Sequence, residues 1–178
     1  MQVSQAFVFL ITVIFDLFSF LIVARFLLQV ARADFYNPIS QSIVKMTDPL
    51  LKPMRRVIPG WGGFDVAALL LLLGIQIIKL TLTSFLSFDH ASGALILMYA
   101  IKYCGSMFIK FFLYAIIIQV IASWIAPGNY NPILTLLHQV TEPLIAPIRR
   151  ALPSVSGLDF SPMVAMILLM FLQKLLSL

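Results

Sequence analysis

The sequence predicts an all-α membrane protein with four transmembrane helices arranged as two similar halves. Composition is the first observation behind this class. Of the 178 residues, 61% are hydrophobic and only 11% are charged, whereas soluble domains carry roughly a quarter charged residues. The second observation is the presence of four apolar runs, at about 7–30, 64–88, 95–126 and 160–178. Each approaches or exceeds the ~20 residues that one span needs, and none alternates like a strand, so we expect helices.

A tandem duplication is the third observation. Asn37-Pro38 recurs as Asn131-Pro132, 94 residues later. At this offset and without a gap, Pro49, Pro53, Arg55, Arg56 and Asp65 meet Pro143, Pro147, Arg149, Arg150 and Asp159. We therefore expect one repeat over residues 1–90 and a second over 91–178, with interfacial motifs at 37–59 and 131–153.

The two halves are expected to stand the same way up. Each contains two spans, so the repeat is parallel and predicts a pseudo-two-fold axis along the membrane normal. Both motifs then lie on one side, together with most of the Lys and Arg residues, while the connector 88–93 has none. The positive-inside rule places the motifs in the cytoplasm and both termini outside it. The first run is expected to be a permanent span rather than a cleaved signal peptide.

The first motif reads as two short interfacial helices. Asn37 and Pro38 have the pattern of an N-cap followed by proline at the first helical position. Asp48 and Pro49 are expected to restart the chain as a second helix, which Pro53 limits. The second copy repeats this with Asn131, Pro132, Glu142, Pro143 and Pro147. The residues predicted to cap the spans that follow are Asp65 and Asp159.

The arginine pairs Arg55-Arg56 and Arg149-Arg150 allow two interpretations. Guanidinium groups bind phosphate oxygens bidentately, so the pairs are candidates for binding anionic lipid headgroups or a partner protein. Alternatively they anchor the chain by the positive-inside rule and pair internally with Asp65 and Asp159.

Four charges fall inside the apolar runs: Asp16, Arg25, Lys79 and Lys110. Asp16 and Arg25 are nine residues apart, about half a turn out of phase, so they face opposite ways. We expect Asp16 to pair with Lys79 or Lys110 from another helix, and Arg25 and Lys79 to extend toward the headgroups from near the span ends. The alternative is an ion or proton path through these groups.

The sequence offers no sign of an enzyme. It has no phosphate-binding loop, dinucleotide turn, nucleophile elbow or zinc-protease motif. The single cysteine, Cys104, excludes an intramolecular disulfide, and His90 and His138 are expected on opposite sides of the bilayer. We therefore expect no metal and no cofactor. Nucleic acid is not an expected partner either, because two basic dipeptides at a membrane surface lack the necessary charge density and aromatic platforms.

The duplicated pattern resembles the YggT family of bacterial inner-membrane proteins over essentially the whole chain. The residues that carry the match are the Asn-Pro, Pro-x-Arg-Arg and Gly-x-Asp motifs of both copies. The resemblance implies an inner-membrane location, with the termini periplasmic, and an ancillary role linked to osmotic-shock tolerance or to assembly of membrane complexes. It supplies no catalytic residue.

Two functions remain open at this point. The first is a membrane organising or assembly factor whose basic motifs bind anionic lipid or a membrane protein partner. The second is an oligomeric channel or transporter for ions under osmotic stress. Small residues in the second span, Ala67, Ala68 and Gly74, favour close helix packing or homo-oligomerisation.

Overall fold

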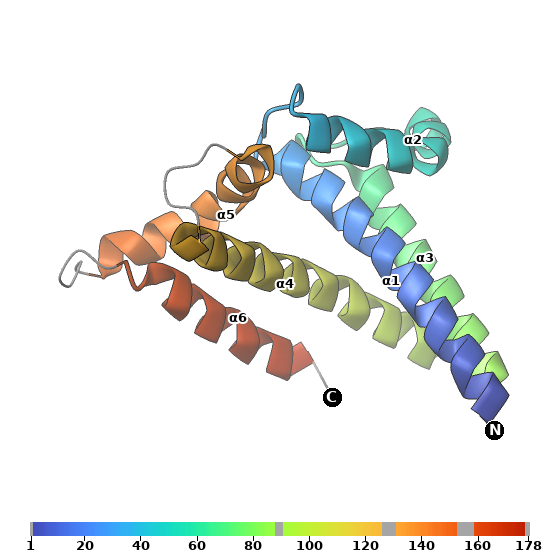
Figure 1. Ribbon diagram of the computed structural model, residues 1–178. Coiled ribbons are helices and arrows are strands. Elements are labelled where there is room, and N and C mark those ends of the chain that lie inside the picture. Colours follow the sequence, from blue (N-terminus) through green and yellow to red (C-terminus); the bar gives the residue numbers. More distant parts are fainter. Residues whose placement is uncertain (1, 88–90, 126–130, 153–158, 177–178) are drawn as a thin grey trace.

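The structure is a computed structural model that describes residues 2–87, 91–125, 131–152 and 159–176, and within these it is all-helical. Figure 1 shows its six helices. In order they are α1 (Gln2–Val30), α2 (Pro38–Val57), α3 (Val66–Leu86), α4 (Gly93–Ile125), α5 (Pro132–Ala151) and α6 (Ser161–Leu176). The predicted fold class is confirmed at this level.

Three of the helices, α1, α3 and α4, are long and apolar enough to cross a membrane. Large apolar side chains remain exposed on them, including Phe9 and Leu17 of α1 and Phe85 of α3. Exposed apolar surface of this extent fits a lipid environment. The fourth predicted span, α6, is apolar but has 16 described residues, fewer than the about 20 that a straight crossing needs.

Each half has the same internal arrangement. The third helix packs along the first, α3 on α1 and α6 on α4, and the middle helix contacts both. Figure 1 also shows that α1 and α4 run in the same general direction. Between the halves the packing is unequal. Helix α3 packs against α4, whereas α6 makes no contact with α1 among the described residues, so a full two-fold relation is not reproduced.

The motifs differ from the prediction of two short helices each. Both α2 and α5 continue through their internal prolines, Pro49 and Pro53 in α2 and Pro143 and Pro147 in α5. A helical proline leaves a backbone carbonyl unpaired and bends the helix. All four prolines are exposed, so the freed carbonyls remain near solvent or headgroups. Figure 1 shows the late part of α2 turned away from its start. The bend takes the place of the predicted break.

Small residues allow the close approach of α3 to its neighbours. Ala67 and Ala68 have no exposed surface and belong to the main apolar core, with Ile22 and Val23 of α1. Gly74 does not share this role, because a Cβ atom added there would meet nothing within 4 Å. The close packing expected of the two alanines is confirmed. Gly74 does not pack closely within the chain, and its part in homo-oligomerisation stays a prediction.

Candidate functional site

The first turns of α2 and α5 lie against each other. Asn37 caps α2 by accepting from Ile39 N at 2.9 Å, and Asn131 does the same for α5 through Ile133 N. Pro38 and Pro132 open the two helices, as predicted. The amide of Asn37 also donates to the carbonyl of Pro132 at 2.9 Å. The two motifs are therefore on the same side of the molecule.

Arg25 does not extend freely toward the headgroups, contrary to the prediction, because α2 holds its guanidinium group. It is only 6% exposed, and its Nη1 atom donates to Val44 O, Thr47 Oγ1 and Asp48 Oδ1 at 3.0, 2.7 and 2.6 Å. Asp48 also pairs with Lys52, and hydrogen bonds from Lys52 and Arg25 hold the pKa of Asp48 below its ordinary value. Asp48 therefore ties α2 to α1 instead of starting a second helix.

The second half has an uncharged version of this contact. Gln119 stands at the position equivalent to Arg25, and its Nε2 atom donates to Thr141 Oγ1 at 2.9 Å. Thr141 is the counterpart of Thr47, and both threonines are fully buried. The hydrogen bond between the first helix and the motif is thus kept in both halves, while the buried charge is present only in the first.

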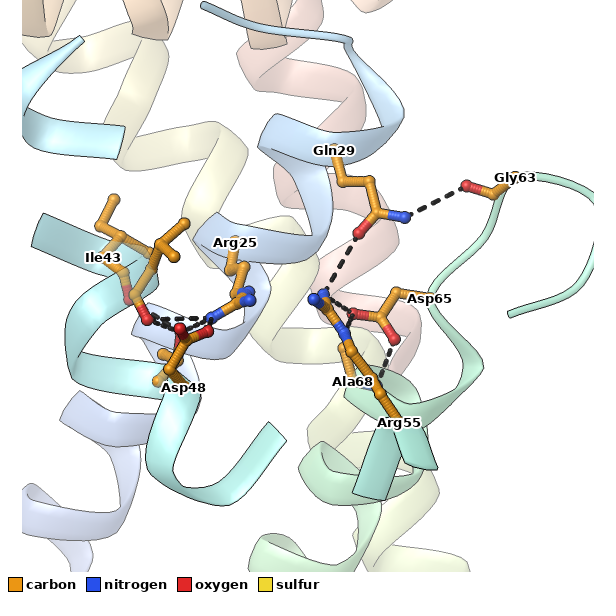
Figure 2. A network of polar contacts seen from close by, with 10 residues as sticks. Arg25, Gln29, Ile43, Asp48, Arg55, Gly63, Asp65 and Ala68 are labelled. Carbon is orange, nitrogen blue, oxygen red and sulfur yellow. Dashed lines mark hydrogen bonds and ion pairs between the residues drawn. The ribbon is translucent and has the colours of Figure 1, made fainter. Parts of the chain in front are cut away.

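The first arginine of each pair is tied to an aspartate of its own half. Arg55 forms an ion pair with Asp65, whose other oxygen accepts from Ala68 N at the start of α3. Figure 2 shows this network beside that of Arg25 and Asp48. Arg149 pairs in the same way with Asp159, with its Nε atom 2.8 Å from Oδ2. The internal pairing and the capping role of Asp65 are confirmed.

Arg149 and Asp159 strengthen each other's charged states. Asp159 accepts from Ser161 N at 2.9 Å, at the first residue of α6. Hydrogen bonds from Ser161 and then from Arg149 lower the pKa of Asp159. Arg149 also pairs with Glu142 at 2.6 Å, and the two carboxylates raise its pKa. Both ion pairs of Arg149 therefore join residues within the second half.

The second arginine of each pair, Arg56 or Arg150, is exposed and has no ion pair with any residue that the structure describes. A cavity of about 200 Å³ lies at the end of α1, against α2. Arg25, Arg32 and Arg55 all line it, and no acidic residue is found among the described part of its wall. We call it the arginine pocket.

Arg32 occupies a backbone position that normally selects glycine. Its φ angle is 48°, in the left-handed region, directly after the end of α1. The backbone N–H groups of Arg32 and Ala33 donate to the carbonyls of Gln29 and Leu28, which is the Schellman pattern with Arg32 at the left-handed position. A non-glycine residue there costs about 1 kcal/mol. An arginine is thus held at a strained position on the wall of the pocket.

At the middle of α1, Asp16 pairs at 2.6 Å with Lys79, one of its two predicted partners. Lys79 is buried, so it too does not extend to the headgroups. Its ammonium group also lies 4.5 Å from the ring centroid of Tyr103. Lys110 has no ion pair with the described residues.

Sequence reasoning did not single out Arg32, Thr47 or Gln119. The signal for the last two is in the repeat register, where Thr47 and Thr141 are identical and Arg25 meets Gln119. Arg32 gives no sequence signal for its conformation. No group of three metal-ligating side chains occurs among the described residues, and His90, Pro153 and Gly157 lie outside them.

Comparison with known families identifies the repeat. The sequence profile of the CCB3/YggT family matches residues 4–86 and 98–178. The chain belongs to the CCB3/YggT family. The two matched segments cover α1–α3 and α4–α6, so the family unit coincides with each half of this YggT-family chain.

Three relatives are similar over nearly their whole length. An uncharacterized protein of Pseudomonas aeruginosa is 42% identical over 174 residues, which are 97% of this chain and 88% of the relative. A Vibrio alginolyticus protein is 39% identical over 95% of this chain and 92% of its own length. The protein YggT of Escherichia coli K12 is 38% identical, over 90% of this chain and 84% of its own length. No solved structure matches this YggT-family chain.

Proposed function

We propose that this YggT-family chain is a non-enzymatic, four-span membrane protein that binds anionic lipid headgroups at the side where α2 and α5 lie. By this binding it would organise or help to assemble complexes in a bacterial inner membrane. In the proposal α6 is the fourth span and crosses a locally thinned bilayer. The family resemblance adds a role under osmotic shock.

The arginine pocket is the observation that carries the proposal. Three guanidinium groups line one cavity of about 200 Å³. Arg25 uses its Nη1 atom for α2, and no described residue accepts from its Nε or Nη2 atoms. Arg32 has no acidic partner among the described residues. Donors of this kind fit a phosphate group.

The position of the pocket favours a lipid over a soluble partner. Arg25 is five residues before the end of α1, which is where a span reaches the membrane surface. Arg25 contacts the amphipathic helix α2, whose first turn lies against that of α5, as expected for helices that lie in the headgroup layer. Arg56 and Arg150 are exposed in the last turns of α2 and α5 and add positive charge to the two motif helices.

The proposed topology follows from the position of both motifs on one side of the molecule. Both motifs meet through Asn37 and Pro132, so they share one membrane surface. That surface carries the arginine pairs and Arg32, whereas the connector 88–93 has no Lys or Arg. The positive-inside rule makes this surface cytoplasmic and both chain ends periplasmic.

The test measures which lipids remain bound. The full chain is purified into nanodiscs with phosphatidylglycerol and phosphatidylcholine in equal amounts, and the annular lipid is quantified. The wild type is expected to enrich phosphatidylglycerol, less so at high salt because exposed charges are screened. Arg32→Gln and the double variant Arg56→Gln/Arg150→Gln should reduce the enrichment. Lys102→Gln removes one positive charge near the start of α4, away from the arginine pocket, and should leave the enrichment unchanged.

Two results would count against lipid binding. Equal retention of both lipids by the wild type would remove the proposal. So would loss of enrichment in Lys102→Gln equal to that in Arg32→Gln, because general charge attraction would then explain the data. If the wild type showed no lipid preference but captured an acidic protein, the proposed ligand would be a protein partner instead of a lipid.

Ion transport by an oligomer is the second candidate, and one observation favours it. A cavity of about 370 Å³ reaches Asp16 and Lys79 and is lined by hydroxyl groups such as Thr12, Thr83 and Ser87. The charges there already neutralise each other at 2.6 Å, which leaves no free carboxylate to carry an ion. Ion flux in proteoliposomes that is unchanged by Asp16→Asn would remove this candidate.

A further inference from the structure

The two halves contain equivalent polar clefts at the end opposite the motifs. In the first half, Thr12, Asp16 and Lys79 line the cavity of about 370 Å³. In the second half, their counterparts 94 residues on, Ser106, Lys110 and Gln173, line a cavity of about 180 Å³. We call these the aspartate cleft and the lysine cleft. Tyr99 and Tyr103 line both, so α4 separates the two.

The duplicated clefts carry different charges. The aspartate cleft contains one acid and one base, and these form an ion pair. The lysine cleft contains Lys102 and Lys110, and none of the described residues in its wall is acidic. Neither lysine has an ion pair with a described residue, although Lys102 lies 5.9 Å from the ring centroid of Tyr99. Among the residues that the structure describes, the two positive charges of the second cleft therefore have no counter-charge.

An unpaired ammonium group is costly at this depth. Lys110 is at the middle of the 33-residue α4. A lone charge at the centre of a span costs about 2.5–3.5 kcal/mol on insertion scales, and such residues face protein or water and mark binding sites or pathways. Because the protein supplies no counter-charge among the described residues, an anion from solution is the group that would best stabilise Lys110.

The neutral groups of the cleft complete a binding site. Ser106 is buried, and its Oγ atom accepts from Gln173 Nε2 at 2.8 Å. This bond orients the Gln173 amide, whose Oε1 atom is buried and accepts no hydrogen bond within the described structure. A hydroxyl of the ligand, or a water bound to it, would satisfy that oxygen. A volume of about 180 Å³ admits a small inorganic anion with a few waters.

We propose that the lysine cleft binds a small inorganic anion of the phosphate or chloride type between Lys102 and Lys110, with Ser106 and Gln173 completing its shell. The aspartate cleft does not share this property, because Asp16 would repel the anion and already neutralises Lys79. This site is independent of the proposed lipid binding, which uses the opposite end of the molecule.

The test uses the full chain in nanodiscs of phosphatidylcholine alone. Sodium gluconate, which supplies a bulky organic reference anion, is replaced stepwise by sodium phosphate or sodium chloride at constant ionic strength. Binding of the anion to the folded state should raise the thermal unfolding midpoint in a saturable way. The response to phosphate or to chloride tells which anion is bound, and either supports the site.

Variants locate the anion. Lys110→Gln and Lys102→Gln should each weaken binding by about 10-fold or more, because each removes a charged donor. Lys45→Gln, an exposed lysine of α2, should bind as the wild type does. Arg32→Gln, which removes one donor of the arginine pocket, should retain the saturable response that Lys102→Gln and Lys110→Gln weaken. If Lys110→Gln fails to fold, Lys102→Gln decides the question. A wild type without a saturable response, undiminished binding in the foldable lysine variants, or binding abolished by Arg32→Gln would overturn the proposal.

Discussion

Arg25 of α1 donates to Thr47 of α2 at 2.7 Å, within a pair of helices that otherwise contact mainly through apolar side chains. The equivalent contact in the second half joins Gln119 to Thr141 at 2.9 Å. Because both contacts are buried and occupy the same register, the link between first helix and motif is a property of the repeat. The charge of Arg25 is an addition found in one half only.

Substitutions at Arg25 separate the link from the charge. Arg25→Ala removes the donor to Thr47 and the main buried partner of Asp48, and we expect a loss of about 2–3 kcal/mol in the free energy of unfolding. Arg25→Gln reproduces the Gln119 arrangement and should lose less. Denaturant titration in mild detergent measures both, with Gln119→Ala as the control. Equal losses in Arg25→Ala and Arg25→Gln would contradict the role of the shared hydrogen bond.

Arg32 allows a test in which stability and binding change in opposite directions. Arg32→Gly relieves the left-handed backbone at φ 48° and should stabilise the fold by about 0.5–1 kcal/mol. The same change removes one guanidinium from the arginine pocket and should lower phosphatidylglycerol enrichment. Thermal unfolding and lipid quantification on one preparation give both values. A stabilised variant with wild-type lipid enrichment would remove Arg32 from the proposed site.

The pair Asp16–Lys79 is expected to matter mainly when it is broken. Lys79→Met leaves Asp16 without its partner inside the apolar layer, which should destabilise the fold by several kcal/mol. The double variant Asp16→Asn/Lys79→Met should recover most of that loss, because an uncharged pair no longer needs a counter-charge. A double-mutant cycle measures this coupling. Additive losses from the two single changes would show that the 2.6 Å contact is energetically unimportant.

The caps of α2 and α5 report on the contact between halves. Asn37→Ala and Asn131→Ala each remove one cap and should each cost about 1 kcal/mol. Asn37→Ala also removes the bond to Pro132 O, so it should cost about 0.5–1.5 kcal/mol more. The difference between the two variants measures the contact. No difference would mean that this hydrogen bond adds nothing to the joining of the halves.

Acid should weaken the motif side. Asp48 and Asp159 have lowered pKa values in the folded chain, so their ion pairs contribute fully above the unfolded pKa of about 3.9 and are lost as the pH falls through the folded values. We expect the thermal unfolding midpoint to decrease when the pH is below about 4. Asp159 is 42% exposed, so its share is small and Asp159→Asn should flatten the profile only slightly. A midpoint unchanged down to pH 3 would contradict both pairings.

Much of this arrangement could be predicted because it is local or repeated. The N-caps at Asn37 and Asn131 depend on a few neighbouring residues, and the sequence contains each pattern twice. The pairing of Asp16 with Lys79 followed from helical phase, which excluded Arg25 and left few candidates. Such inferences need no knowledge of how the helices are packed.

The contacts that depend on packing could not be predicted in the same way. Asp48 was assigned to a helix start because proline follows it, and the sequence does not show that a bent helix continues through Pro49. That continuation is what brings Asp48 to Arg25. The equivalence of the two clefts likewise appears only when Lys110 and Gln173 are seen on neighbouring helices.

The central claim is that both halves stand the same way up and place α2 and α5 on one membrane surface. Single cysteines at Arg56→Cys and Arg150→Cys, in a Cys104→Ser background, can be labelled with a membrane-impermeant maleimide in right-side-out and inverted vesicles. The account predicts that both positions are labelled only in inverted vesicles. Labelling of the two positions from opposite sides of the membrane would contradict it.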